Sequence, residues 1–142
     1  MANEIKNLVQ KIGSSISSAI PGAQTYDYPV LSVNQVPAAI VLVESVDPHV
    51  VMGLSHTMFG QLRVICLTNK PDDREAWLRV YDMMNSTGSG TSFVAALTVD
   101  PRFGTACDDS TIEKIENIGI REIAGGQYVG FDVILRFMKS VP

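Results

Sequence analysis

The most regular hydrophobic pattern in the chain lies near its C-terminus, where large apolar residues occupy every second position. Because successive side chains of a β-strand point to opposite faces, this period of two predicts a strand with one buried face. The predicted inward residues are Val129, Phe131, Val133, Leu135 and Phe137, and the opposite face carries Gly130, Asp132, Ile134 and Arg136. The flexible residues Ala124-Gly125-Gly126 predict a hairpin turn that joins this strand to a preceding one.

Two segments show the spacing of three and four residues that is typical of amphipathic helices. The apolar stripe of the first is Ile5, Leu8, Val9, Ile12 and Ile16, and Pro21-Gly22 ends this helix. The second begins after Pro71, where Asp72 and Glu75 have the spacing of a capping box. Its predicted buried stripe is Trp77, Val80, Tyr81 and Met84, with Arg74, Arg79 and Asp82 away from the centre of the stripe.

Four further segments complete the predicted fold. The aromatic segment Thr25–Pro29 ends in a proline, which is typical of an edge strand. The uninterrupted apolar runs Ala38–Val43 and Gln61–Thr68 predict central strands covered on both faces, and Phe93–Leu97 predicts a short helix. We therefore expect residues 1–142 to form a single α/β domain of the α+β type. It should have an N-terminal helix, a mixed, mainly antiparallel sheet, one long central helix and a C-terminal β-hairpin.

The segment from Glu44 to Gly60 is predicted as a long loop of unusual composition. Asp47-Pro48, Gly53 and Gly60 interrupt regular structure, yet the segment is also rich in large apolar residues, among them Val50, Val51, Met52, Leu54, Met58 and Phe59. A loop this long and this apolar indicates contact with a partner or a projecting hairpin. The alternative is that the loop folds back on its own core.

The charge and the cysteines narrow the class of protein. The net charge is −4, and the 11 Lys and Arg residues form no basic block, so binding to nucleic acid through phosphate contacts is disfavoured. The two cysteines lie far apart, no export signal is visible, and no apolar run reaches the roughly 20 residues that cross a bilayer. We expect a soluble protein made in a cytoplasm, with reduced thiols.

Few residues could carry catalysis or bind a metal. A zinc site from His49, His56, Cys66 and Cys107 would lack the short ligand pairs that preorganise such sites. Cys66 is predicted to be a core residue, and the acids after Cys107 disfavour its thiolate. The acidic pairs Asp72-Asp73 and Asp108-Asp109 are typical of a helix start and a turn. The sequence therefore predicts no enzyme, no cofactor and no metal.

Several short motifs follow one another along the chain, namely Tyr26-Asp27-Tyr28-Pro29, Ser32-Val33-Asn34, Pro37-Ala38-Ala39, Asp73-Arg74, Phe93–Leu97 with Asp100-Pro101, Asp108-Asp109, Asn117-Ile118-Gly119 and Gly125–Gly130. In this order they resemble tail terminator (tail-to-head joining) proteins of long-tailed bacteriophages. Each motif is a turn or cap that many folds use, and the resemblance depends on their order and spacing across most of the chain. It implies an α/β subunit of a hexameric ring that stops growth of the tail tube and docks the neck.

The resemblance also implies partners and a place for the protein. The partners would be other copies of the chain, the tail tube protein and a neck or connector protein, at the tail-neck junction of a virion assembled in a bacterial cytoplasm. DNA would pass through the ring without specific binding, and no membrane would be involved.

Two hypotheses about surfaces follow. Because a ring needs a heterologous interface, the apolar loop (Val50, Val51, Met52, Leu54, Met58 and Phe59), together with Tyr26 and Tyr28, is predicted to contact neighbouring subunits or the tube. Asp72, Asp73, Asp108 and Asp109 are candidates for an acidic channel lining that keeps DNA phosphates from sticking.

Two alternatives remain open at this point. The first is another neck, head-completion or tail-completion component of the virion, because such proteins are also small ring-forming α/β domains. The second is a domain that binds a small ligand or catalyses hydrolysis. It would require a deep pocket with convergent polar groups, for which the sequence offers no obvious residues.

Overall fold

The computed structural model describes residues 4–20, 23–27, 37–49, 56–69, 74–84, 92–98, 100, 102–123 and 125–141. The helices in these residues are α1 (Glu4–Ala19), α2 (Arg74–Met83) and α3 (Phe93–Thr98). The strands are β1 (Gln24–Tyr26), β2 (Ala38–His49), β3 (His56–Asn69), β4 (Asp109–Ile123) and β5 (Gly126–Val141). Together they form one α+β domain.

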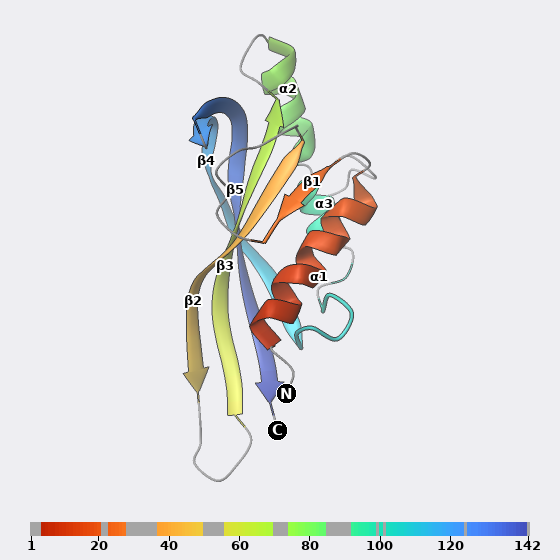
Figure 1. Cartoon of the computed structure of the whole chain (residues 1–142), viewed down its shortest axis with the longest axis vertical. Helices are drawn as coiled ribbons and strands as arrows, with labels where there is room; N and C mark the ends of the chain where they lie inside the picture. The colour runs from red at the N-terminus through yellow and green to blue at the C-terminus, as the bar shows by residue number, and fades with distance from the viewer. Residues whose placement is uncertain are drawn as a thin grey trace.

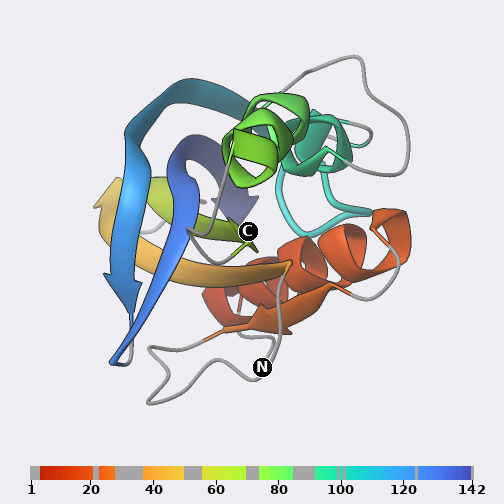
Figure 2. The ribbon, with the colours of Figure 1, turned by 90° about the horizontal axis from the view of Figure 1, so that it is seen from above.

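The five strands form one mixed sheet in the order β1-β2-β3-β5-β4. β1 runs parallel to β2 at the edge of the sheet, and the other neighbouring pairs are antiparallel. In Figure 1 α1 lies along one face of the sheet and α2 lies at one end of the molecule; seen from above, β4 and β5 lie on the opposite side from α1 (Figure 2). The predicted N-terminal helix, edge strand, mainly antiparallel sheet and C-terminal hairpin are confirmed.

The core lies between the helices and the inner face of the sheet, which we define as the face covered by α1. The alternation predicted for β5 is confirmed, since its five inward side chains are all buried: Val129, Phe131, Val133, Leu135 and Phe137. The ring of Phe131 meets that of Phe93 from α3 edge to face, with centroids 6.2 Å apart. The predicted apolar stripe of α1 packs on the same core through Leu8, Ile12 and Ile16.

The short helix α3 follows a polar residue that connects it to α2. The hydroxyl of Ser92 donates to the carbonyl oxygen of Met83, with 2.9 Å between the oxygen atoms. It also accepts the backbone N–H of Ala95 at 3.2 Å, which satisfies one of the amides left open at a helix start. Ser92 is buried, so these bonds fix where α3 sits relative to the end of α2.

The prediction of one long central helix is wrong, because α2 has only 10 residues. The predicted buried stripe is also shifted by part of a turn. Val80 and Met83 are buried, Trp77 and Met84 are half-buried, and Tyr81 is 54 % exposed. The reason is that α2 covers one end of the sheet rather than its middle, so a narrower stripe faces the core.

The described part of residues 44–60 forms strands rather than a long loop, which agrees with the projecting hairpin that the sequence also allowed. β2 continues to His49 and β3 starts at His56, so both strands extend well beyond the predicted central runs. A β-bulge between Val43 and Ser45 shifts the register of β2 at this point. Beyond the bulge, Ser45–His49 of β2 and His56–Gln61 of β3 continue the sheet together with the last residues of β5 and the first residues of β4, and we call this end of the sheet the arm. In Figure 1 its strands β2, β3 and β5 reach past α1.

The central strands approach each other closely at Gly130, which generates a prediction about stability. A side chain at this position would overlap the backbone carbonyl oxygen of Cys66 on the neighbouring strand. We expect Gly130→Ala to lower the free energy of unfolding by about 1–3 kcal/mol in urea denaturation, because a packed core accommodates added volume poorly.

The matched control is Gly13→Ala in α1, where an added methyl group would make an ordinary 3.5 Å contact with Thr25. This control should stabilise the protein slightly, because alanine is the better helix former by about 0.5–1 kcal/mol. Equal stability of Gly130→Ala and the wild type would contradict the close approach of β3 and β5.

Candidate protein-interaction site

The arm exposes a row of four side chains that crosses the sheet on its outer face, which is the face opposite α1. Asp47 pairs with Phe59, Phe59 pairs with Met138, and Met138 pairs with Asp109. We call these four residues the arm row. Phe59 is 45 % exposed and Met138 is 37 % exposed, and the aspartates at both ends are also exposed. Two large apolar side chains thus lie next to each other in solvent with a carboxylate on either side.

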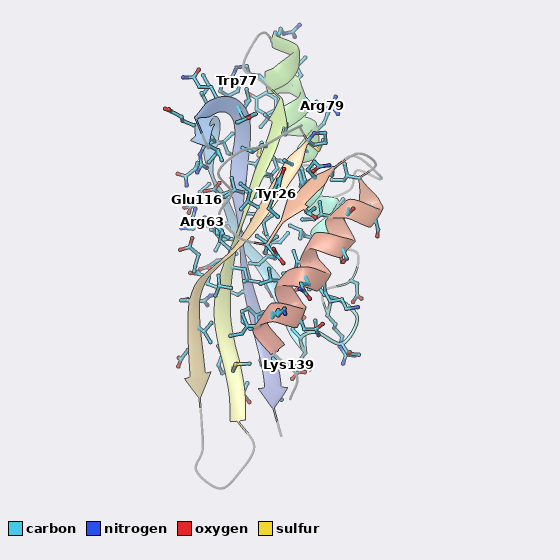
Figure 3. All side chains as sticks on the ribbon, in the orientation of Figure 1. Tyr26, Arg63, Trp77, Arg79, Glu116 and Lys139 are labelled. Carbon is cyan, nitrogen blue, oxygen red and sulfur yellow. The ribbon has the colours of Figure 1, made fainter. Side chains whose placement is uncertain are left out.

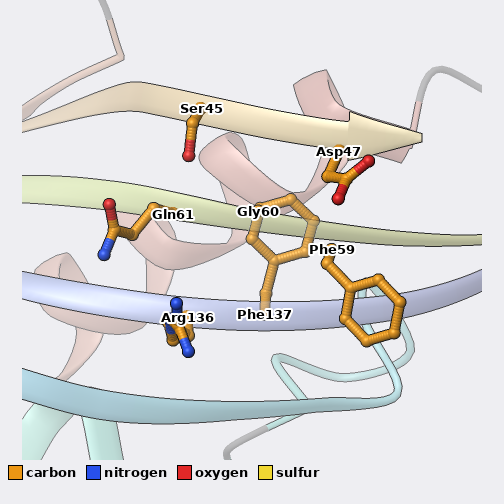
Figure 4. A pocket seen from close by; sticks show the side chains of 7 residues that line it. All are labelled: Ser45, Asp47, Phe59, Gly60, Gln61, Arg136 and Phe137. Atoms are coloured by element: carbon orange, nitrogen blue, oxygen red, sulfur yellow. The ribbon is translucent and has the colours of Figure 1, made fainter. Parts of the chain in front are cut away.

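A hollow of about 410 Å³ lies beside this row. It is lined by Ser45, Asp47, Phe59, Gly60, Gln61, Arg136 and Phe137. Figure 4 shows Asp47 of β2, Phe59 of β3 and Arg136 of β5 around it. Because Asp47, Phe59 and Arg136 are all exposed, the hollow is part of a surface and is suited to the side chains of another protein.

A network of charged side chains occupies the middle of the outer face. Asp132 of β5 is fully buried, and its carboxylate accepts hydrogen bonds from Arg63 at 2.6 Å, from Arg121 at 2.5 Å and from the side-chain amide of Asn117 at 2.9 Å. Three donors from β3 and β4 therefore converge on one carboxylate. A buried carboxylate requires such partners, because an unpaired one would be strongly destabilising.

Arg63 of β3 connects this network to all three of the strands β2, β4 and β5. Besides Asp132 it contacts Glu44 of β2 at 2.5 Å and Glu116 of β4 at 2.9 Å, and Figure 3 shows Arg63 and Glu116 side by side. The hydrogen bonds that the Arg63 guanidinium donates to Glu44 and Asp132 raise its pKa, so it stays charged at all relevant pH values. The pKa of Glu116 is lowered by the hydrogen bond that it accepts from Lys114 and, to a smaller extent, by the one that it accepts from Arg63. The network ties β2, β3, β4 and β5 together next to the arm.

The structure describes only part of the predicted interface. Val50, Val51, Met52, Leu54 and Tyr28 lie outside the described residues. Phe59 is exposed on the arm, as the predicted interface requires. The expectation that Met58 is exposed is wrong, because it belongs to a strand, alternates with Phe59 and is only 9 % exposed. Tyr26 is half-buried on β1, where it packs beside the buried outer-face residues Ile40 and Tyr128.

Of the predicted acidic lining, the structure describes Asp108 and Asp109. Asp109 is the first residue of β4 and pairs with Met138 near the end of β5, and Asp108 immediately precedes it. Hydrogen bonds from Ser140 lower the pKa of Asp108, with the backbone N–H of Ser140 2.9 Å from its carboxylate. Asp72 and Asp73 lie outside the described residues.

The described part of the chain contains no group of three or more His, Cys, Asp or Glu side chains arranged to hold a metal ion. Cys66 and Cys107 are both buried free thiols, and burial raises the pKa of each. For Cys107 the pKa is about 11, and Asp108 and Asp109 contribute to this rise, as expected from the sequence. None of the described helices is long and apolar enough to span a bilayer.

Sequence reasoning missed the charge network, although a signal for it was present. Arg63 interrupts an otherwise apolar strand, and Asp132 faces away from the core in the alternating strand. Charged residues at such positions on two central strands indicate a pair. Their adjacency depends on the register between β3 and β5, which the hydrophobic pattern does not supply.

Comparison of the chain with models of known protein families finds no family that matches, and comparison with curated proteins finds no similar sequence. The function is therefore inferred from the fold and from the side chains described above.

The charge network generates a second prediction about stability. Asp132→Asn should lower the free energy of unfolding by about 3 kcal/mol, because both arginines lose the carboxylate that compensates their partial burial. Glu122→Gln on β4 is the control, and its exposed side chain should change stability by less than about 0.5 kcal/mol. Chemical denaturation of both variants measures the difference, and a neutral effect of Asp132→Asn would show that the network is dispensable.

The raised pKa of Cys107 generates a prediction about pH. Below the ordinary thiol pKa of 9.0 the thiol is protonated in both the folded and the unfolded chain, so it adds no dependence on pH. Between pH 9 and about 11 the thiol ionises only in the unfolded chain, which favours unfolding. The stability of the wild type relative to Cys107→Ala should therefore be constant below pH 9 and fall from there to about pH 11. A constant difference over this whole range would contradict the prediction.

Proposed function

We propose that this protein is a structural subunit of a tailed-phage virion, a tail terminator that caps the tail tube as a ring and joins it to the neck. The observation that carries the proposal is the arm row, in which exposed Phe59 and Met138 lie between Asp47 and Asp109. Large apolar side chains on a projecting end of a sheet are costly to expose, and a protein partner removes them from water.

The shape of the sheet supports a role in assembly. β2 and β3 extend past the helical layer, so the arm can reach a neighbouring molecule while the core stays intact (Figure 1). The charge network holds the strands at the base of the arm in register, which makes the arm a rigid projection. These features fit the expectation from the resemblance, namely a small α+β subunit that binds other proteins.

The acidic ends of the arm row suit a subunit next to DNA. Asp109 is exposed, and Asp108 is half-exposed with a pKa lowered by hydrogen bonds from Ser140. If this edge of the arm faces a DNA channel, its negative charge prevents adhesion of phosphates.

Electron microscopy of particles made without this protein tests the proposal. A missing terminator should give overlong or unattached tails. Leaking capsids with normal tails would instead assign the protein to head completion, which is the nearest alternative role in the neck.

The arm row also generates a prediction for a single variant. Phe59→Asp should leave the fold intact, because the side chain is exposed, but should reduce the number of joined particles at least about tenfold. Complementation with the variant protein, followed by counting of joined and free tails, measures this. Ser17→Asp on the exposed side of α1 is the control and should complement fully. Full complementation by Phe59→Asp would remove the arm row from the proposed interface.

A further inference from the structure

A second exposed apolar surface lies on α2 and β4. On α2 the exposed apolar residues are Leu78 and Tyr81, which are 37 % and 54 % exposed. On β4 they are Ile118 and Ile120, which are 48 % and 56 % exposed. We call these four residues, together with Trp77, the α2–β4 patch. The described part of the chain has seven exposed large apolar side chains. Four of them belong to the α2–β4 patch and two to the arm row.

Trp77 joins the two halves of this patch. The end of its indole ring would lie 3.8 Å from a side chain at Gly119, so it reaches the segment of β4 between Ile118 and Ile120. A register shift between Glu116 and Gly119 and a positive φ of 55° at Asn117 mark a bulge in β4 next to this segment. Such bulges turn side chains away from the regular pleat, which accounts for isoleucines in solvent on this edge strand.

The patch and the arm row lie at opposite ends of the molecule. Figure 1 places α2 at one end of the sheet, whereas the paired ends of β3 and β5 that carry Phe59 and Met138 lie at the other end. Figure 3 places Trp77 at the α2 end, between the helix and the β4-β5 hairpin. One copy of the chain can therefore offer both surfaces to different neighbours at the same time.

The charges of the two surfaces are complementary. Arg74 lies three, four and seven residues before Trp77, Leu78 and Tyr81, so it shares their side of α2, and it is exposed. The arm row carries Asp47 and Asp109. Within the described residues, none of these three charged groups forms an ion pair. Two arm rows placed face to face would bring two carboxylates from each copy together, which disfavours a contact between like surfaces.

We propose that the arm row of one copy docks on the α2–β4 patch of a second copy, with Asp47 of the first beside Arg74 of the second. Phe59 and Met138 then cover Tyr81, Leu78 and the two isoleucines of β4. Asp47 is assigned to the ion pair because the carboxylate of Asp109 already accepts the backbone N–H of Ser110 at 2.9 Å.

This contact joins two unlike surfaces and is therefore heterologous. Each copy keeps one free arm row and one free patch after the first contact, so addition continues until a ring closes or a filament forms. The inference rests on the proposed function, because it names the surfaces through which the subunits of the proposed ring would meet.

Mixing two variants tests the contact in solution. Phe59→Asp disables the arm row and keeps the patch, whereas Tyr81→Asp disables the patch and keeps the arm row. Both positions are exposed, so both variants should fold, which circular dichroism checks. Sedimentation velocity at up to about 1 mM should show association of the wild type, each variant alone near 15.4 kDa, and a dimer in the equimolar mixture. The dimer forms because one intact arm row meets one intact patch.

Three results would overturn the contact: a wild type that stays monomeric at every concentration, a variant that associates alone as the wild type does, or a mixture that does not dimerise.

Charge reversal supplies a second measurement. Asp47→Arg and Arg74→Asp should each weaken self-association about tenfold, and the chain that carries both changes should regain it. Failure of the double variant to recover would exclude this ion pair.

These results are independent of the tail phenotype. A dimer in the mixture together with normal tails in particles lacking the protein would keep the contact and reject the proposed function. Overlong tails together with a monomeric mixture would do the opposite.

Discussion

Burial of the alternating side chains of β5 is the constraint on which the other elements depend. β5 pairs with β3 on one side and with β4 on the other, and its inner face supplies Phe131, Leu135 and Phe137 to the core. A shift of register by one residue would place these side chains in solvent and Asp132 in the core. The cost of both changes holds β5, and with it the two neighbouring strands, in one arrangement.

The same strand organises the outer face. Asp132 lies between inward-facing Phe131 and Val133, so the register that buries the phenylalanines also presents the carboxylate to Arg63 and Arg121. Arg63 in turn contacts Glu44 immediately at the bulge of β2. The inner core and the outer charge network therefore support the same pairing of strands, and the arm begins where the network ends.

The strands of this sheet are longer than its helical layer can cover. α1 and α3 cover the inner face, whereas the arm projects at one end and the α2–β4 patch lies at the other. The resulting exposed apolar residues differ in charge environment, with aspartates around Phe59 and an arginine beside Tyr81. Both the proposed role in a virion and the proposed contact between copies follow from this mismatch between sheet and helices.

The sequence by itself determined the elements whose patterns are local: the stripe of α1, the alternation of β5, the glycine turn before it and the mixed, mainly antiparallel sheet. It also indicated that Phe59 belongs to a surface with an unusual apolar character. Only the tertiary structure decided that Arg63 meets Glu44 and Asp132, that Met58 is buried and that Tyr81 is exposed. Periodicity specifies which side chains share a face of an element, but the exposure of that face and its partners depend on strand register and on where each helix covers the sheet.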